Sequence, residues 1–255
     1  MDDQPQSQQP ISKKQQRRLE RKQAKQARAA AQTGKRTGSR IIFWIVILAV
    51  IGFFVYAIGR LATNTPTDSN TKTDIAITAS DYIKGTPGAS VELIEYSDFQ
   101  CPACATFYPI IKQLVSEYSD RIAFAYRHFP LPQHQHGKIM ARAAEAAGKQ
   151  GKFWEMHDLI FENQSQWSAL IKVDQTISSY ATKLGLDIAQ FEKDIDSGEI
   201  KEIVDSSYQS GSGYGVNSTP SFFLNGVKIL SPRGLTEFEA VIDNALISAN
   251  DSTAN

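Results

Sequence analysis

Cysteine is almost absent from this chain of 255 residues, which has only two, and both lie in one CPAC motif at Cys101 and Cys104. Two cysteines cannot complete a closed Cys-rich zinc site, although half of such a site has the same CxxC spacing. The chain has only three Met residues, forms no Met-rich pattern, and shows no internal repeat. These scarcities leave a redox dithiol as the main interpretation of the CPAC motif.

Acidic residues are scarce in the first forty positions, where 11 of the 27 Lys and Arg residues stand against 3 of the 27 Asp and Glu residues. The formal net charge of zero therefore hides a tail of +8 and a remainder of −8. The tail nearly lacks large apolar residues and cannot form a core. Nucleic-acid binding is one interpretation of this basic run. This basic run ends directly at an apolar segment, however, which favours a topology signal that keeps the tail in the cytoplasm.

Charge is absent from residues 41–59, which lie between Arg40 and Arg60. In a helix these 19 residues span roughly 28 Å, close to a hydrocarbon core of about 30 Å. We therefore expect one transmembrane helix, with a cytoplasmic tail at 1–40 and the remainder outside. A cleaved signal peptide is the alternative, with Ala57 and Gly59 as a cleavage pattern, but the run exceeds the usual length of roughly 7 to 15 residues.

Large side chains are also rare in residues 60–74, which predict a flexible linker to a globular domain at 75–250. The rest of the chain alternates strand-like and helix-like segments, with Asn225 and Gly226 giving a type I′ hairpin signal. Strands are expected at 75–77, 91–96, 121–129, 221–224 and 227–230. Helices are expected from 102 onward and at 137–149, 152–162, 174–184, 187–198, 199–210 and 235–247.

The CPAC motif lies where the strand at 91–96 gives way to a helix. Pro102 suits the first helical position, where its missing N–H is no loss, so Cys101 becomes the N-cap residue. Its sulfur then faces the unpaired N–H groups of Ala103 and Cys104 at the positive end of the helix dipole, which favours a thiolate. We expect Cys101 to be exposed and Cys104, one turn further on, to be buried.

The segment EYSDFQCPAC at 95–104 resembles the active site of DsbA-like thiol:disulfide oxidoreductases, a bacterial-envelope branch of the thioredoxin superfamily. Three further segments are similar to the same family: HFPL at 128–131, GKFWEMHDLIF at 151–161 and VNSTPSFFLNG at 216–226. As a whole the chain resembles the membrane-anchored BdbD-like branch of this family. The resemblance covers about residues 75–250. It implies an α/β thioredoxin fold with an inserted all-α helical subdomain at about 132–213, preceded by one transmembrane helix.

The resemblance also implies a function and a site. The chain would be a single-pass protein of the bacterial cell membrane whose extracytoplasmic domain introduces disulfides into exported proteins. Cys101 would be the nucleophile and Cys104 its partner, with no cofactor beyond their redox-active disulfide. Thr219 and Pro220 would form a cis peptide bond that faces the cysteines and holds substrate. A trans proline at the start of a strand is the alternative.

Two partners follow from the same resemblance: reduced exported proteins as substrates, and a membrane quinone-linked partner of the DsbB-like or VKOR-like type that reoxidises the dithiol. Glu95 stands six residues before Cys101, where the family keeps a buried acid that exchanges protons with the second cysteine. A solvent-facing strand glutamate is the alternative for Glu95.

Other functions of the same fold stay open at this point. The family's strongest oxidases carry His where this chain has Ala103, which puts the oxidising power in doubt and leaves a disulfide reductase or isomerase as an alternative. A metal-binding thioredoxin-like protein is a further alternative, because His128, His134 and His136 lie near one another in the sequence.

Overall fold

The structure, a computed structural model, describes residues 17–27, 47–50, 52–53, 56 and 75–253. The chain divides into two units, Met1–Asp68 and Ser69–Asn255. In the first unit, residues 17–27 of the basic segment form an exposed helix.

The membrane prediction concerns residues 41–59, of which 41–46, 51, 54–55 and 57–59 lie outside the described residues. The predicted linker at 60–74 lies outside them as well. Among the residues that are described, no helix is long and apolar enough to cross a membrane.

Within residues 75–253, the strands form one sheet in the spatial order β1-β3-β2-β4-β5. The central strands β2 and β3 run parallel, and the other neighbours pair antiparallel. Side chains alternate between the two faces, so Leu93 and Phe124 enter one core while Ile94 and Ala125 enter the other. The strands are β1 (Ile83–Gly85), β2 (Val91–Ser97), β3 (Ile122–His128), β4 (Ser221–Leu224) and β5 (Val227–Ile229).

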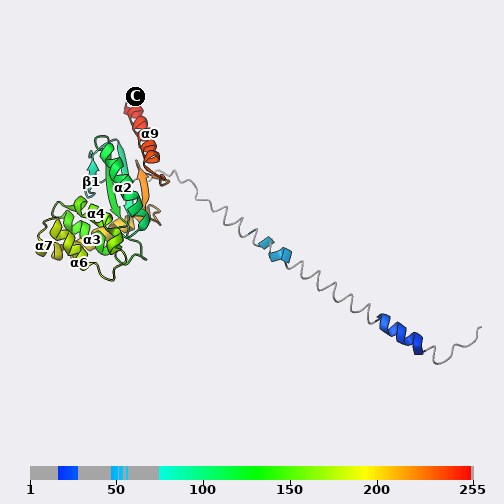
Figure 1. Ribbon diagram of the computed structural model, residues 1–255. Helices are drawn as coiled ribbons and strands as arrows, with labels where there is room; N and C mark the ends of the chain where they lie inside the picture. The colour runs from blue at the N-terminus through cyan, green and yellow to red at the C-terminus, as the bar shows by residue number, and fades with distance from the viewer. Residues whose placement is uncertain (1–16, 28–46, 51, 54–55, 57–74, 254–255) are drawn as a thin grey trace, which may run out of the picture. The chain divides into compact units, whose positions relative to one another are not determined.

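Helices α2 (Pro102–Glu117) and α9 (Leu235–Thr253) pack together on the face that carries Leu93. The remaining helices of residues 75–253 lie between β3 and β4 in sequence, as the predicted insertion requires. Figure 1 shows α3, α4, α6 and α7 gathered on the side of this unit away from α9. These inserted helices are α3 (Gly137–Gly148), α4 (Phe153–Glu162), α5 (Gln164–Trp167), α6 (Asp174–Lys183), α7 (Ile188–Ile195) and α8 (Gly198–Gly213).

The expectation of an α/β sheet with an inserted helical region is confirmed, including the hairpin, where Asn225 and Gly226 have φ of 48° and 79°. The strand predicted at 75–77 is wrong, and the first strand is β1. Side chains, not a neighbouring strand, satisfy this backbone: Arg127 donates to the carbonyl of Ala76, and the Glu92 carboxylate accepts from the N–H of Ile77.

Helix α8 is longer than the predicted 199–210, because it continues through the glycine-rich stretch to Gly213. The glycine at 211 is required by packing: a Cβ there would lie 2.7 Å from Phe129 Cδ2 and 2.9 Å from Tyr96 Cδ1. The pattern predicted a chain break, whereas the structure uses Gly211 to bring a helix close to two aromatic rings.

We predict that Gly211→Ala lowers the free energy of unfolding by about 1 to 3 kcal/mol, because the added methyl group overpacks this contact. Gly213→Ala is the matched control, since no heavy atom lies within 4 Å of the position that its Cβ would take, and it should be neutral or stabilising by up to about 1 kcal/mol. Urea unfolding of both variants measures the difference. Equal effects of the two substitutions would contradict the packing argument.

Candidate active site

The two cysteines lie at the first turn of α2. Cys101 is the N-cap residue, with φ of −72° and ψ of 122°, and Pro102 follows at the first helical position. Both cysteines are free thiols in the structure. The N–H of Cys101 donates to the carbonyl of Asp98, which closes a turn between β2 and α2. The predicted strand, CxxC and helix arrangement is confirmed.

The exposure predicted for Cys101 is not what the structure shows. Cys101 is only 6% exposed and Cys104 is 0% exposed, so the two differ in degree of burial only. The reason is the neighbouring loop: the Cys101 thiol lies 3.4 Å from the carbonyl oxygen of Thr219, to which it donates when protonated. An incoming thiol can therefore reach only a small part of the Cys101 sulfur.

The pKa of Cys101 is lowered to about 5, chiefly because the Cys104 thiol donates a hydrogen bond to the Cys101 sulfur. Burial acts in the opposite direction, while Thr219 and the N–H groups of Cys104 and Ala103 lower the pKa further. The pKa of Cys104 is raised well above its ordinary value, first by burial and then by its bond to Cys101 and the charge of Glu95. The pair therefore divides into a thiolate and a neutral thiol.

Thr219 and Pro220 are joined by a cis peptide bond, as predicted. Thr219 is 9% exposed, and its carbonyl contacts Cys101 from the loop before β4. The sequence-distant Thr219-Pro220 pair is thus brought beside the cysteines.

Glu95 is 4% exposed, so the alternative of a solvent-facing strand glutamate is wrong. It lies on β2 between Tyr126 of β3 and Phe222 of β4. Burial raises the pKa of Glu95 to about 7; Ser97 opposes this rise and the charge of Cys101 adds to it. Glu95 can therefore hold or release a proton near neutral pH.

Two residues that sequence reasoning missed fix the backbone around Cys101. Gln164 of α5 donates from its amide nitrogen to the carbonyls of Phe99 and Cys101, at 2.7 and 2.9 Å. Asp98, 2% exposed, accepts from the N–H groups of Gln100 and Leu131. Asp98 could have been suspected from its place beside the motif, but no sequence signal points to Gln164.

The three neighbouring histidines take separate positions. His128 ends β3, with Nε2 2.9 Å from Glu145 Oε1. His134 Nδ1 lies 2.6 Å from Asp98 Oδ2. His136 precedes α3, and its Nε2 lies 2.7 Å from the carbonyl oxygen of Leu170.

Comparison with known proteins gives a family match and several relatives. A family model described as thioredoxin matches residues 78–244. Na(+)/H(+) antiporter NhaA 3 of Salinispora tropica is 34% identical over 174 residues, which cover 66% of this chain and 25% of the antiporter. The NhaA antiporter of Herminiimonas arsenicoxydans is 36% identical over a region that covers 64% of this chain and 25% of the antiporter. The chain thus spans about a quarter of the length of the curated relatives it matches.

Solved structures show the same fold. Wolbachia pipientis alpha-DsbA1 is 22% identical, covers 70% of this chain and 97% of its own, and has a TM-score of 0.64. Oxidised BdbD from Bacillus subtilis is 19% identical, with coverage of 65% and 92% and a TM-score of 0.56. A periplasmic thioredoxin-like protein from Salmonella enterica serovar Typhimurium is 20% identical, with coverage of 66% and 90% and a TM-score of 0.51.

We predict that the ultraviolet absorbance of the Cys101 thiolate in the reduced protein titrates with a midpoint near pH 5. A thiol whose folded pKa is lowered contributes stability above its unfolded pKa, near 9, and this contribution is lost as pH falls through about 5. The free energy of unfolding of the reduced protein should therefore rise as pH increases from 5 to 9, relative to that of Cys101→Ser. A midpoint near pH 9 would contradict the stabilised thiolate.

Proposed function

We propose that this chain, which belongs to the thioredoxin family and shares its fold with DsbA and BdbD proteins, is a DsbA-like dithiol oxidase that introduces disulfides into exported proteins. The observation that carries this proposal is the electrostatic difference between the two sulfurs. The Cys101 sulfur is a stabilised thiolate at the start of α2, and Cys104 beneath it stays neutral. A stable thiolate favours the reduced enzyme, which makes the disulfide form an oxidant.

The exchange begins when a client thiolate attacks the Cys101 sulfur of the enzyme disulfide. The Cys101–Cys104 bond breaks, Cys104 takes the electron pair and a proton, and a mixed disulfide forms between Cys101 and the client. A second client thiolate then attacks the client sulfur of the mixed disulfide. This step releases an oxidised client and leaves Cys101 as the thiolate.

Three further residues have proposed roles around the sulfurs. Thr219 and Pro220 hold the client backbone: proline has no N–H, so the end of β4 stays open for an extended peptide that pairs with Thr219. Glu95 exchanges protons with Cys104, which its burial and its pKa of about 7 support.

The pKa of Cys101 also indicates how strong an oxidant this would be. The strong oxidase DsbA has a pKa of about 3.5 and a potential of about −120 mV, and thioredoxin has about 7 and about −270 mV. A pKa of about 5 lies between them. We expect a potential between those of DsbA and thioredoxin. A disulfide reductase or isomerase is the second candidate, favoured by Ala103, which adds no charge to stabilise the thiolate.

A membrane anchor and an extracytoplasmic active site complete the proposal. Its support is the uncharged run at 41–59 behind the basic segment at 1–40. One solved structure with the same fold is described as periplasmic. In this position the enzyme disulfide is reduced each time a client is oxidised. A membrane quinone-linked partner of the DsbB-like or VKOR-like type would reoxidise it.

We predict that the full-length chain, purified in its oxidised form, converts a reduced unfolded protein to its disulfide form. Cys104→Ala has no disulfide of its own, so it is given the oxidised client; its Cys101 thiolate should attack the client disulfide and stop at a mixed disulfide, because no second enzyme thiol remains to resolve it. Cys101→Ala should give neither product. Non-reducing gels after thiol alkylation measure all three outcomes.

Equilibration with glutathione separates the oxidase from a reductase. A potential above about −250 mV supports an oxidase, and a lower one would assign a reductase. Client trapping by Cys101→Ala but not by Cys104→Ala would reverse the roles of the two sulfurs.

The topology prediction concerns intact cells that produce the full-length chain. A protease added outside should release the domain that follows residue 75, because it lies outside the membrane, while the basic segment at 1–40 stays protected. Fragment-specific antibodies measure both. Recovery of a soluble secreted domain that begins near Arg60 would show a cleaved signal peptide instead.

A further inference from the structure

The starting point is the proton of Cys104, and the inference rests on the proposed function. Each time the enzyme disulfide opens, the Cys104 sulfur must gain a proton, and each reoxidation must remove it. Cys104 is 0% exposed, so no bulk water reaches it directly. A sulfur with a raised pKa is also a poor leaving group, which makes proton delivery part of the chemical step.

Polar side chains lie on the sheet face beneath Cys104. Glu95 and Ser97 are alternate residues of β2, and they pair with Tyr126 and His128 of β3 in the parallel register. Because alternate residues share a face, all four lie on the side covered by α2. Each is at most 4% exposed, so this polar belt is buried under an otherwise apolar core.

Three members of the belt have unused hydrogen-bonding atoms. Ser97 Oγ, Tyr126 Oη and His128 Nδ1 are buried and have no hydrogen-bond partner among the described residues. Buried polar groups of this kind are usually satisfied by protein or ordered water. Burial raises the pKa of both Cys104 and Tyr126, and the Ser97 hydroxyl acts against that rise in both. The Ser97 hydroxyl therefore acts on both the Cys104 sulfur and the Tyr126 hydroxyl, from the sheet face that Ser97 shares with Tyr126 beneath Cys104.

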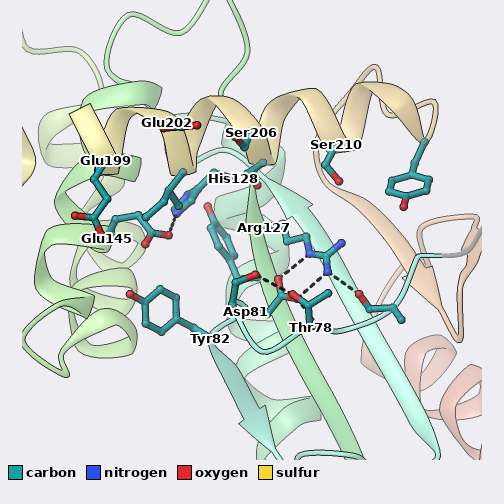
Figure 2. Close-up of a pocket in the computed structure, with 16 residues that line it drawn as sticks. Thr78, Asp81, Tyr82, Arg127, His128, Glu145, Glu199, Glu202, Ser206 and Ser210 are labelled. Atoms are coloured by element: carbon teal, nitrogen blue, oxygen red, sulfur yellow. Dashed lines mark hydrogen bonds and ion pairs between the residues drawn. The ribbon is translucent and has the colours of Figure 1, made fainter. Parts of the chain in front are cut away.

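The far end of the belt opens into a cleft of about 600 Å³ (Figure 2). Strand β1 pairs with β3 only as far as Ala125, so the edge of β3 beyond it is uncovered there. Tyr126 and His128 line this cleft together with Glu145 of α3 and Ser207 of α8, whose buried hydroxyl is also unpartnered among the described residues. A cleft of this size and polarity holds water.

We infer that Ser97 and Tyr126 form a proton pathway that connects the Cys104 sulfur with water in this cleft. When the enzyme disulfide opens, Cys104 takes a proton from the Ser97 hydroxyl, Ser97 takes one from Tyr126, and the buried Tyr126 hydroxyl takes one from a water that enters from the cleft. Each hydroxyl gives and receives one proton, so only Cys104 gains one and the water loses one. Reoxidation runs the same transfers in reverse.

Glu95 offers a second route, and the two must be separated. A small cavity of about 20 Å³, room for one water, lies between Glu95, Lys84 and Asp158. A proton held by Glu95 could reach Cys104 from that side. Asp98 and the Cys101 thiolate are the other charged groups that act on the cluster.

The test is a single-turnover reaction of the oxidised full-length chain with a reduced dithiol peptide, stopped by acid and followed by thiol alkylation. Ser97→Ala and Tyr126→Phe should each slow the opening of the enzyme disulfide about tenfold, because the Glu95 route remains. In both variants the solvent deuterium isotope effect on the opening rate should differ from the wild-type value. Ser97→Thr keeps a hydroxyl and should keep the rate. Ser206→Ala, an exposed serine on the same wall of the cleft, is the matched control and should also keep it.

Double variants identify the shared route. Ser97→Ala combined with Tyr126→Phe should be no slower than either alone, whereas Ser97→Ala combined with Glu95→Gln should be slower than either. The inference is overturned if Ser97→Ala opens within twofold of the wild-type rate, if Ser97→Thr is as slow as Ser97→Ala, or if the Ser97 and Tyr126 effects multiply. A wild-type chain that exchanges no disulfide overturns the proposed function and this inference together.

Discussion

The hydrogen bond from the Cys104 thiol to the Cys101 sulfur is the interaction on which the rest of the site depends. It requires a neutral Cys104, and complete burial keeps that sulfur neutral. Burial in turn requires the first turn of α2 to lie flat on the sheet, above Glu95 and the other polar residues of β2 and β3. The packing of the core and the charge of the reactive sulfur are therefore one property of the fold.

The helical insertion takes part in this arrangement directly. Gln164 binds the carbonyls of Phe99 and Cys101, and the Gln100 amide donates to the carbonyl of Ser168 just after α5. The loop that carries the reactive sulfur is thereby fixed from the side of the insertion, while Thr219 contacts it from the side of β4. A lid that only covered the cysteines would need none of these bonds, so the insertion is better described as a support for the N-terminus of α2.

Most of the fold followed from local sequence signals, and the errors lie where tertiary contacts overrode them. Strand alternation, Pro102 after Cys101 and the Asn225-Gly226 turn each act within a few residues, and each was predicted correctly. Gln164 and the continuation of α8 through Gly211 depend on residues far away in the chain. The prediction that Cys101 is exposed was wrong for the same reason, because the loop that covers it begins more than a hundred residues later.

The source of the thiolate's stability has a consequence for how the site can be tuned. The main contributions that lower the pKa of Cys101 come from the Cys104 thiol, Thr219 and two backbone N–H groups, and no cationic side chain is among them. None of these donors changes charge between pH 5 and 8, so their hydrogen bonds to the sulfur do not titrate in that range. A family member with His in place of Ala103 adds a group that titrates in the same range. In this chain the neighbour that titrates in that range is Glu95, whose pKa of about 7 is raised in part by the charge of Cys101, so the proton on Glu95 and the charge on Cys101 are coupled.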